Sequence, residues 1–133
     1  MKNYLEPKLT VELREISTYT LAYIGDAVFE LMVRTFLCVS GNQSVEKLHN
    51  TSVNFVSAKA QANALQILLP VFYEDEIEIY KRGRNLHTGQ TPKSSTAQDY
   101  HNSTGLEAVF GYLYLSCNIK RLNELFDLVI RKD

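Results

Sequence analysis

Apolar residues recur every three or four positions along most of this chain, which is the spacing of helices with a buried side. The clearest example spans residues 17–37, where Leu21, Ile24, Val28 and Leu31 form one stripe. Further apolar residues in the same segment lie on the other sides of such a helix. The pattern therefore predicts a central helix that is buried nearly all round.

Capping and turn residues divide the next part of the chain into two shorter helices. The polar stretch at residues 40–43 predicts a turn. Ser44 is placed to cap a helix that runs to about Phe55, and Ser57 to cap a third helix that ends before Pro70. These three helices account for the first half of the chain.

The second half repeats the helical pattern around one polar loop. Residues 73–85 begin with acids and end with bases, which suits a helix dipole. Residues 87–96 are polar and contain Gly and Pro, which predicts a loop. Apolar residues dominate again over 97–115, and a last helix is predicted over 120–130. With no convincing strand, we predict an all-α bundle of about six or seven helices in a single domain.

Composition fits this fold and excludes several classes of protein. The chain has 133 residues, of which 45% are apolar, so it can bury a core and is not a disordered composition. Cys38 and Cys117 are too few for a disulfide scaffold and are predicted to be buried, reduced thiols. No signal peptide and no apolar run of about 20 residues occurs, so we expect a cytoplasmic protein without a membrane span.

Acidic residues within the two most apolar segments are the first candidates for chemistry. Asp26 and Glu30 are the only charges within residues 16–33. Glu107 is the only full charge within residues 100–119. A buried carboxylate without a partner costs several kcal/mol, so these positions need an explanation.

The two acidic segments also resemble each other. Asp26 and Glu107 are both followed by Ala-Val-Phe, and glycine lies close by at Gly25 and Gly111. Small residues allow two helix backbones to approach closely. We infer that these helices cross in the core and bring the two acids near one another.

The local partners of the acids differ. Glu30 can pair with Arg34, four residues further on, in the favourable orientation. Asp26 and Glu107 have no base three or four residues away on either side. Mg²⁺ prefers oxygen ligands and needs only one or two carboxylates together with substrate phosphate. The residues thus leave two interpretations open, a shared metal site or core acids satisfied by distant bases or hydroxyls.

A basic segment follows in the second half of the chain. Residues 79–98 contain no acid but include Lys81, Arg82, Arg84 and Lys93, interleaved with glycine, proline and hydroxyl residues. Such a segment can lie along a phosphodiester backbone, although a solvated basic helix end is the simpler interpretation. Together with two acids that could hold a metal ion, it indicates a metal-dependent phosphodiesterase. The three histidines lack the spacing of a zinc site.

Several short motifs resemble a known family. YIGDAVFE at 23–30 resembles the signature helix of the ribonuclease III endonuclease domain, and EAVFGYLYL at 107–115 is similar to its second acidic helix. FVSAKAQA at 55–62, KRGRN at 81–85 and Pro-Lys at 92–93 fit the Mini-ribonuclease III subfamily, which lacks a double-stranded RNA-binding domain. The resemblance extends over nearly the whole chain.

The resemblance implies a ribonuclease III endonuclease-domain-like helical bundle that forms a homodimer. It implies Mg²⁺-dependent cleavage of double-stranded RNA that leaves 5′-phosphate and 3′-hydroxyl ends. The usual substrate of the subfamily is precursor 23S ribosomal RNA in bacteria, and a large-subunit ribosomal protein is a candidate partner that presents it.

Carried over to this sequence, the resemblance gives Asp26 the place of the essential aspartate and Glu107 that of the last metal-binding glutamate. The larger enzymes carry two further acids where this chain has Ala22 and Thr104. Glu30 and Thr104 are therefore candidates for supporting the ligands from outside. The loss of two acids also keeps open a non-catalytic RNA-binding module with the same fold.

Overall fold

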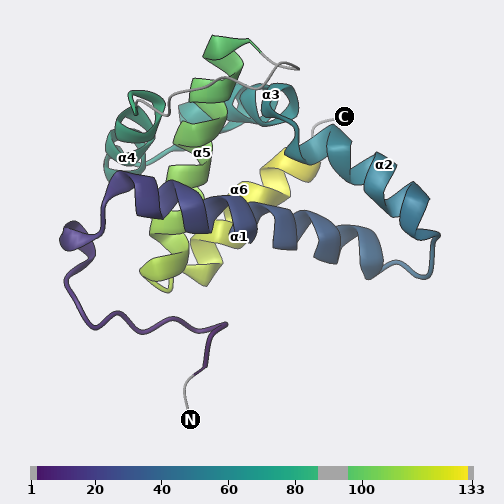
Figure 1. The fold of residues 1–133 in the computed structure, drawn as a ribbon, viewed down its shortest axis with the longest axis horizontal. Helices are drawn as coiled ribbons and strands as arrows, with labels where there is room; N and C mark the ends of the chain where they lie inside the picture. The colour runs from purple at the N-terminus through teal and green to yellow at the C-terminus, as the bar shows by residue number, and fades with distance from the viewer. Residues whose placement is uncertain (1–2, 87–95, 132–133) are drawn as a thin grey trace.

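A computed structural model of the chain describes residues 3–86 and 96–131. Within these ranges the regular structure is entirely helical, so the predicted all-α class is confirmed (Figure 1). None of the helices in the described part has the length and apolar character needed to cross a membrane. The α-helices are α1 Thr18–Cys38, α2 Val45–Val56, α3 Ala58–Leu68, α4 Glu74–Arg84, α5 Ala97–Leu115 and α6 Ile119–Ile130, with short 3-10 helices η1 Leu13–Glu15 and η2 Leu69–Val71.

Hydroxyl side chains begin four of the α-helices. Ser17, Ser44, Ser57 and Thr96 each accept a hydrogen bond from the backbone N–H three residues further on, at 3.0 to 3.2 Å. Each bond satisfies an amide that has no partner inside the helix. The predicted caps at Ser44 and Ser57 are confirmed.

Helices α1 and α5 cross at the centre of the molecule (Figure 1). A Cβ atom at Gly25 would lie 1.6 Å from the carbonyl oxygen of Glu107, and one at Gly111 would lie 1.9 Å from that of Leu21. No side chain fits into either space, so glycine is required at both positions. The crossing inferred from the two glycines is therefore confirmed.

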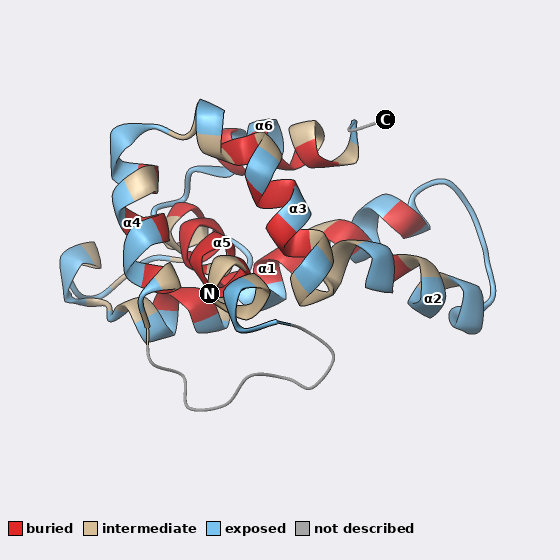
Figure 2. Ribbon diagram, turned by 90° about the horizontal axis from the view of Figure 1, so that it is seen from above, coloured by how far each residue is buried: buried red, intermediate tan, exposed pale blue. Residues whose placement is uncertain are grey.

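Around this crossing the other helices bury their apolar sides. Phe29 of α1 packs edge-on against Phe110 of α5 at 5.2 Å and against Phe126 of α6 at 6.0 Å between ring centroids. Gly83 near the end of α4 lies against Gly105 of α5, where a Cβ atom would come within 2.8 Å of the Gly105 Cα. Figure 2 shows the buried residues on the facing sides of α1, α3, α5 and α6, whereas α2 is mostly exposed.

A buried ion pair joins α6 to the start of α4. The Arg121 guanidinium donates to both carboxylate oxygens of Glu76, each at 2.8 Å, and these residues are 8% and 1% exposed. The same guanidinium donates to the carbonyl of Val71 at 2.7 Å and lies 3.8 Å from the ring centroid of Tyr73. Glu76 also accepts the N–H of Tyr73 at 2.8 Å, so one carboxylate caps α4 and holds α6.

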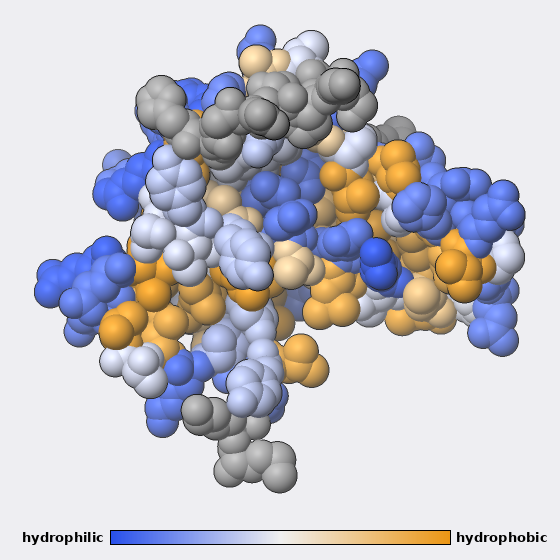
Figure 3. Space-filling model, in the orientation of Figure 1, coloured by the Kyte–Doolittle hydropathy of each residue, from blue (hydrophilic) through white to orange (hydrophobic). Residues whose placement is uncertain are grey.

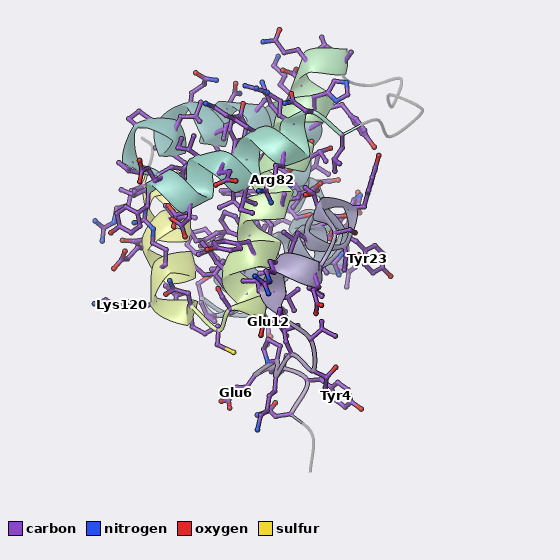
Figure 4. All side chains as sticks on the ribbon, turned by 90° about the vertical axis from the view of Figure 1, so that its left-hand side faces the viewer. Tyr4, Glu6, Glu12, Tyr23, Arg82 and Lys120 are labelled. Carbon is purple, nitrogen blue, oxygen red and sulfur yellow. The ribbon has the colours of Figure 1, made fainter. Side chains whose placement is uncertain are left out.

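The prediction that α1 is buried nearly all round is wrong. Tyr23 is 81% exposed and Leu31 is 55% exposed, and Asp26 is also exposed. In Figure 4 the side chain of Tyr23 points away from the helical bundle. Since α1 lies on one face of the molecule (Figure 1), the other helices cover only its inner side. An apolar stripe on its outer side is left uncovered.

The prediction that both cysteines are buried is also wrong. Cys38 and Cys117 are free thiols, as expected, but both are exposed. Cys38 is the last residue of α1, and Cys117 follows the end of α5, where its thiol donates to the carbonyl of Pro7 at 2.9 Å. Helix ends reach the surface, so apolar neighbours in sequence did not imply burial here.

Candidate functional site

The carboxyl groups of Asp26 and Glu107 meet where α1 crosses α5. The contact between Gly25 and the Glu107 backbone sets this approach, because Asp26 is the next residue of α1. The two carboxyl groups are joined by a hydrogen bond. Asp26 is exposed and Glu107 is half-buried, so the pair opens to solvent from the Asp26 side. The structure thus brings together the two acids that stand out in the sequence.

The Glu107 carboxyl of this pair binds a proton more tightly than an ordinary glutamate does. Burial, followed by the negative charge of Asp26 and its hydrogen bond, raises the pKa of the Glu107 carboxyl to about 9. No ion pair within the described residues involves either acid. At neutral pH the Glu107 carboxyl is therefore protonated, and a bound divalent cation would instead compensate its negative charge.

A third residue, Gln61 of α3, completes this cluster. Its side chain hydrogen-bonds to the Glu107 carboxyl, which lowers the pKa of that group and partly opposes the effect of burial. The residue is 2% exposed. Gln61 was not predicted from the sequence, although a signal was present: it shares one helix face with Ala64, Leu65 and Leu68, all buried, and is the polar member of that stripe.

Thr104 and Ala22, which stand where the larger enzymes carry further acids, are both buried. Thr104 is 6% exposed and its hydroxyl donates to the backbone carbonyl of Tyr100 at 2.9 Å. Ala22 is 9% exposed. In the parts of the chain that the structure describes, no group of three or more Asp, Glu, His or Cys side chains could hold a metal ion. Two carboxylates that open to solvent still fit Mg²⁺, which keeps several waters and takes substrate phosphate as a ligand.

Glu30 lies one turn beyond Asp26 on α1, and its carboxylate forms an ion pair with a base on the same helix. Its carboxylate is paired with the guanidinium of Arg34 at 3.1 Å, and both side chains are well exposed. This is the local pairing that the sequence predicts, four residues apart on one helix.

The predicted RNA-binding bases lie at the end of α4, with one exception. Lys81 is exposed, Arg82 is paired with Glu78, and the Arg84 guanidinium lies 5.5 Å from the ring centroid of Tyr80. Figure 4 labels Arg82 near the middle of the face that is turned towards the viewer. Lys93, the fourth predicted base, lies outside the described residues.

The end of α4 lies close to the helix that carries Glu107. A Cβ atom at Gly83 would come within 3.0 Å of the carbonyl oxygen of Thr104, one turn before Glu107. The backbone at the end of α4 therefore lies beside α5 one turn before Glu107, whereas the Arg82 side chain lines a groove together with Leu21 and Tyr112.

Comparison with known proteins gives matches along most of the chain. The family model of the ribonuclease III domain matches residues 19–118. A protein named Mini-ribonuclease 3 from Clostridium tetani is 41% identical over 121 residues, which cover 90% of this chain and 80% of the relative. Another protein of that name, from Streptococcus pneumoniae, is 40% identical over 124 residues, which cover 92% of this chain and 97% of the relative. A crystal structure of a Fusobacterium nucleatum protein matches with a TM-score of 0.80 at 28% identity, covering 90% of this chain and 95% of that one.

Proposed function

This chain belongs to the ribonuclease III family, among the proteins named Mini-ribonuclease 3, and on that premise we propose that it is a Mg²⁺-dependent endonuclease that cleaves double-stranded RNA. The observation that carries the proposal is the contact between the carboxyl groups of Asp26 and Glu107 at the crossing of α1 and α5. Both acids lie inside the region matched by the family model.

In this proposal the two carboxylates bind the cation, and the exposed side of Asp26 is where the scissile phosphate approaches. A bound Mg²⁺ supplies an acidified water and neutralises charge on the phosphoryl oxygens. Because the pKa of Glu107 is about 9 in the metal-free protein, its carboxyl gives up a proton when the cation binds. Hydrolysis leaves 5′-phosphate and 3′-hydroxyl ends.

The bases at the end of α4 have the role of gripping the duplex. We infer that Lys81, Arg82, Arg84 and Lys93 neutralise backbone phosphates and read the shape of an A-form helix, without reading its sequence. Binding of this kind weakens as salt concentration rises, because each phosphate contact releases counterions.

A homodimer is part of the same proposal. The uncovered side of α1 exposes Tyr23 and Leu31, and a groove beside it is lined by Ile24, Met32 and Tyr114. The face that carries α1 presents apolar side chains beside polar ones (Figure 3). A second copy of the chain would cover this stripe, and two-fold symmetry would offer one site to each RNA strand.

For the natural substrate we propose precursor 23S ribosomal RNA, cut in the bacterial cytoplasm. A large-subunit ribosomal protein bound to the precursor is the candidate for presenting the duplex. This part of the proposal is supported by the family resemblance alone.

The test is cleavage of a structured double-stranded RNA by the purified protein with Mg²⁺. We expect the wild type to cut, EDTA to stop it, and Asp26→Asn to bind the duplex in a gel-shift assay without cutting it. Asp127→Asn makes the same chemical change on α6, where Asp127 pairs with Arg131 at 2.6 Å, and should cut like the wild type. A wild type that binds but never cuts with any divalent metal would instead be a non-catalytic RNA-binding module.

A further inference from the structure

Gln61 presents a polar side chain where the surrounding structure is apolar. The residue is 2% exposed and lies on a face of α3 that otherwise carries apolar residues. A buried amide without partners costs free energy, so its hydrogen bonds must be found within the protein. The hydrogen bond that the structure gives the Gln61 side chain is the one to the Glu107 carboxyl of α5.

The hydrogen bond from Gln61 is made to Glu107, which is the more buried of the two acids. Glu107 is held between the Asp26 carboxyl on α1 and the Gln61 carboxamide on α3, so two different helices fix its side chain. The amide N–H donates to the carboxylate, which favours the charged form that a cation needs. Because the carboxamide is neutral, it adds no charge that would compete with the cation.

We propose that Gln61 is a positioning residue: it holds the Glu107 carboxylate in the orientation shared with Asp26 and so completes a cation site that has only two acids. The inference rests on the proposed function and deepens it, because it names the residue outside the ligand pair that sets the affinity for the cation. Partners that orient a metal ligand typically contribute about 10- to 100-fold in metal affinity or activity.

The packing around Gln61 explains why this residue can position a ligand. Ala64 and Leu65, on the same face of α3, are 2% and 0% exposed, so the helix is firmly seated where the carboxamide leaves it. A side chain anchored in this way loses little further freedom when it orients Glu107. Thr104, by contrast, uses its hydroxyl to donate to the Tyr100 carbonyl of its own helix.

The experiment is a titration of the full-length protein, without RNA, with Mn²⁺ followed by electron paramagnetic resonance. Gln61→Met keeps the length of the side chain and removes the donor, and we expect it to weaken Mn²⁺ binding by about 10- to 100-fold. Gln66→Met is the matched control, because Gln66 is exposed on the same helix, and it should bind like the wild type. Asp26→Asn lacks one of the two proposed ligands, so the part of the Mn²⁺ binding that it loses belongs to this site.

Cleavage assays supply a second readout. In Gln61→Met the Mg²⁺ concentration that gives half-maximal cleavage of double-stranded RNA should rise by the same factor, while the KM for RNA at saturating Mg²⁺ should stay at the wild-type value. A role confined to packing would not produce this split. If Gln61→Met does not fold, Gln61→Asn keeps a polar amide that is one methylene too short to reach, and the same weakening is expected.

The outcomes separate this inference from the proposed function. Wild-type Mn²⁺ affinity in a folded Gln61→Met or Gln61→Asn protein would overturn the positioning role, even if the wild type cuts and Asp26→Asn does not. A wild type that never cuts would overturn the proposed function, and the Mn²⁺ titration would still decide whether Gln61 positions Glu107. A wild type that binds no Mn²⁺ would overturn both.

Discussion

At the scale of single residues, the electrostatic cost of the site falls on Glu107. Asp26 is exposed and can be hydrated, whereas Glu107 is half-buried and faces a second carboxyl group. Burial and the neighbouring acid both favour the protonated form of Glu107. The metal-free protein therefore stores a proton at the place where the cation is proposed to bind.

This proton predicts how the stability of the metal-free protein depends on pH. In the unfolded chain Glu107 loses its proton near the ordinary glutamate pKa of 4.5, whereas in the folded protein the pKa is about 9. Between these values the folded state binds one more proton than the unfolded state, so the free energy of unfolding falls as pH rises. Glu107→Gln lacks this proton, and we expect its stability relative to the wild type to increase steadily across the window.

Urea denaturation in EDTA at several pH values between about 5 and about 9 measures this difference. Two stability profiles that run parallel across the window would contradict the raised pKa of Glu107. Added Mg²⁺ should reduce the decline in the wild type alone, because only the wild type keeps both ligands.

At the scale of helices, the Arg121–Glu76 pair is a buried ionic connection between elements far apart in the sequence. It joins α6 to the start of α4, and both side chains are almost fully buried. The hydrogen bonds from Arg121 to Glu76 also raise the pKa of the guanidinium, which stays charged. Removal of Glu76 would leave the buried Arg121 charge with only Glu124 as a counterion, at 3.2 Å and with a side chain that is 45% exposed.

We therefore expect Glu76→Gln to cost about 3–5 kcal/mol of unfolding free energy, because the buried Arg121 charge loses its buried counterion. The matched control is Asp127→Asn, which breaks an exposed ion pair on α6 and should cost less than about 1 kcal/mol. Denaturant titration of both variants at neutral pH measures the two costs. Similar small losses in both would show that the buried pair contributes no more than a surface pair.

The limits of the sequence predictions also lie at this scale. The helix ends at Ser44 and Ser57 were predicted correctly because capping is a local property of the chain. The α1–α5 crossing was predicted from glycines that make close approach possible. The exposed side of α1 was not, because periodicity cannot tell which apolar face another helix covers. Gln61 was missed because its role depends on a contact between α3 and α5 that no local pattern records.

At the scale of the whole molecule, the uncovered side of α1 is where we propose that two copies of the chain associate. Leu31 is 55% exposed and lies between two neighbouring grooves on this side. An exposed apolar stripe of this kind is typical of an interaction surface. The proposed dimer would bury it and place two sites on one RNA duplex.

We expect Leu31→Asp to convert the proposed dimer to a monomer, because it places a charge inside the interface. Size-exclusion chromatography with light scattering measures the mass, and cleavage of both strands of a duplex should fall with dimer content. Val45→Asp is the control, since Val45 is 82% exposed on α2 away from the stripe. A wild type that is already monomeric at micromolar concentration would rule out the dimer.

The proposed catalytic site depends on Asp26 and Glu107 acting as one unit. The most direct measurement compares single-turnover cleavage of double-stranded RNA by Asp26→Asn, Glu107→Gln and the double variant. If both acids hold one cation, each single variant should lose about as much activity as the double variant, on the order of 10³-fold or more. Losses that multiply, or a double variant that still cuts, would show that the two acids do not form a single catalytic site.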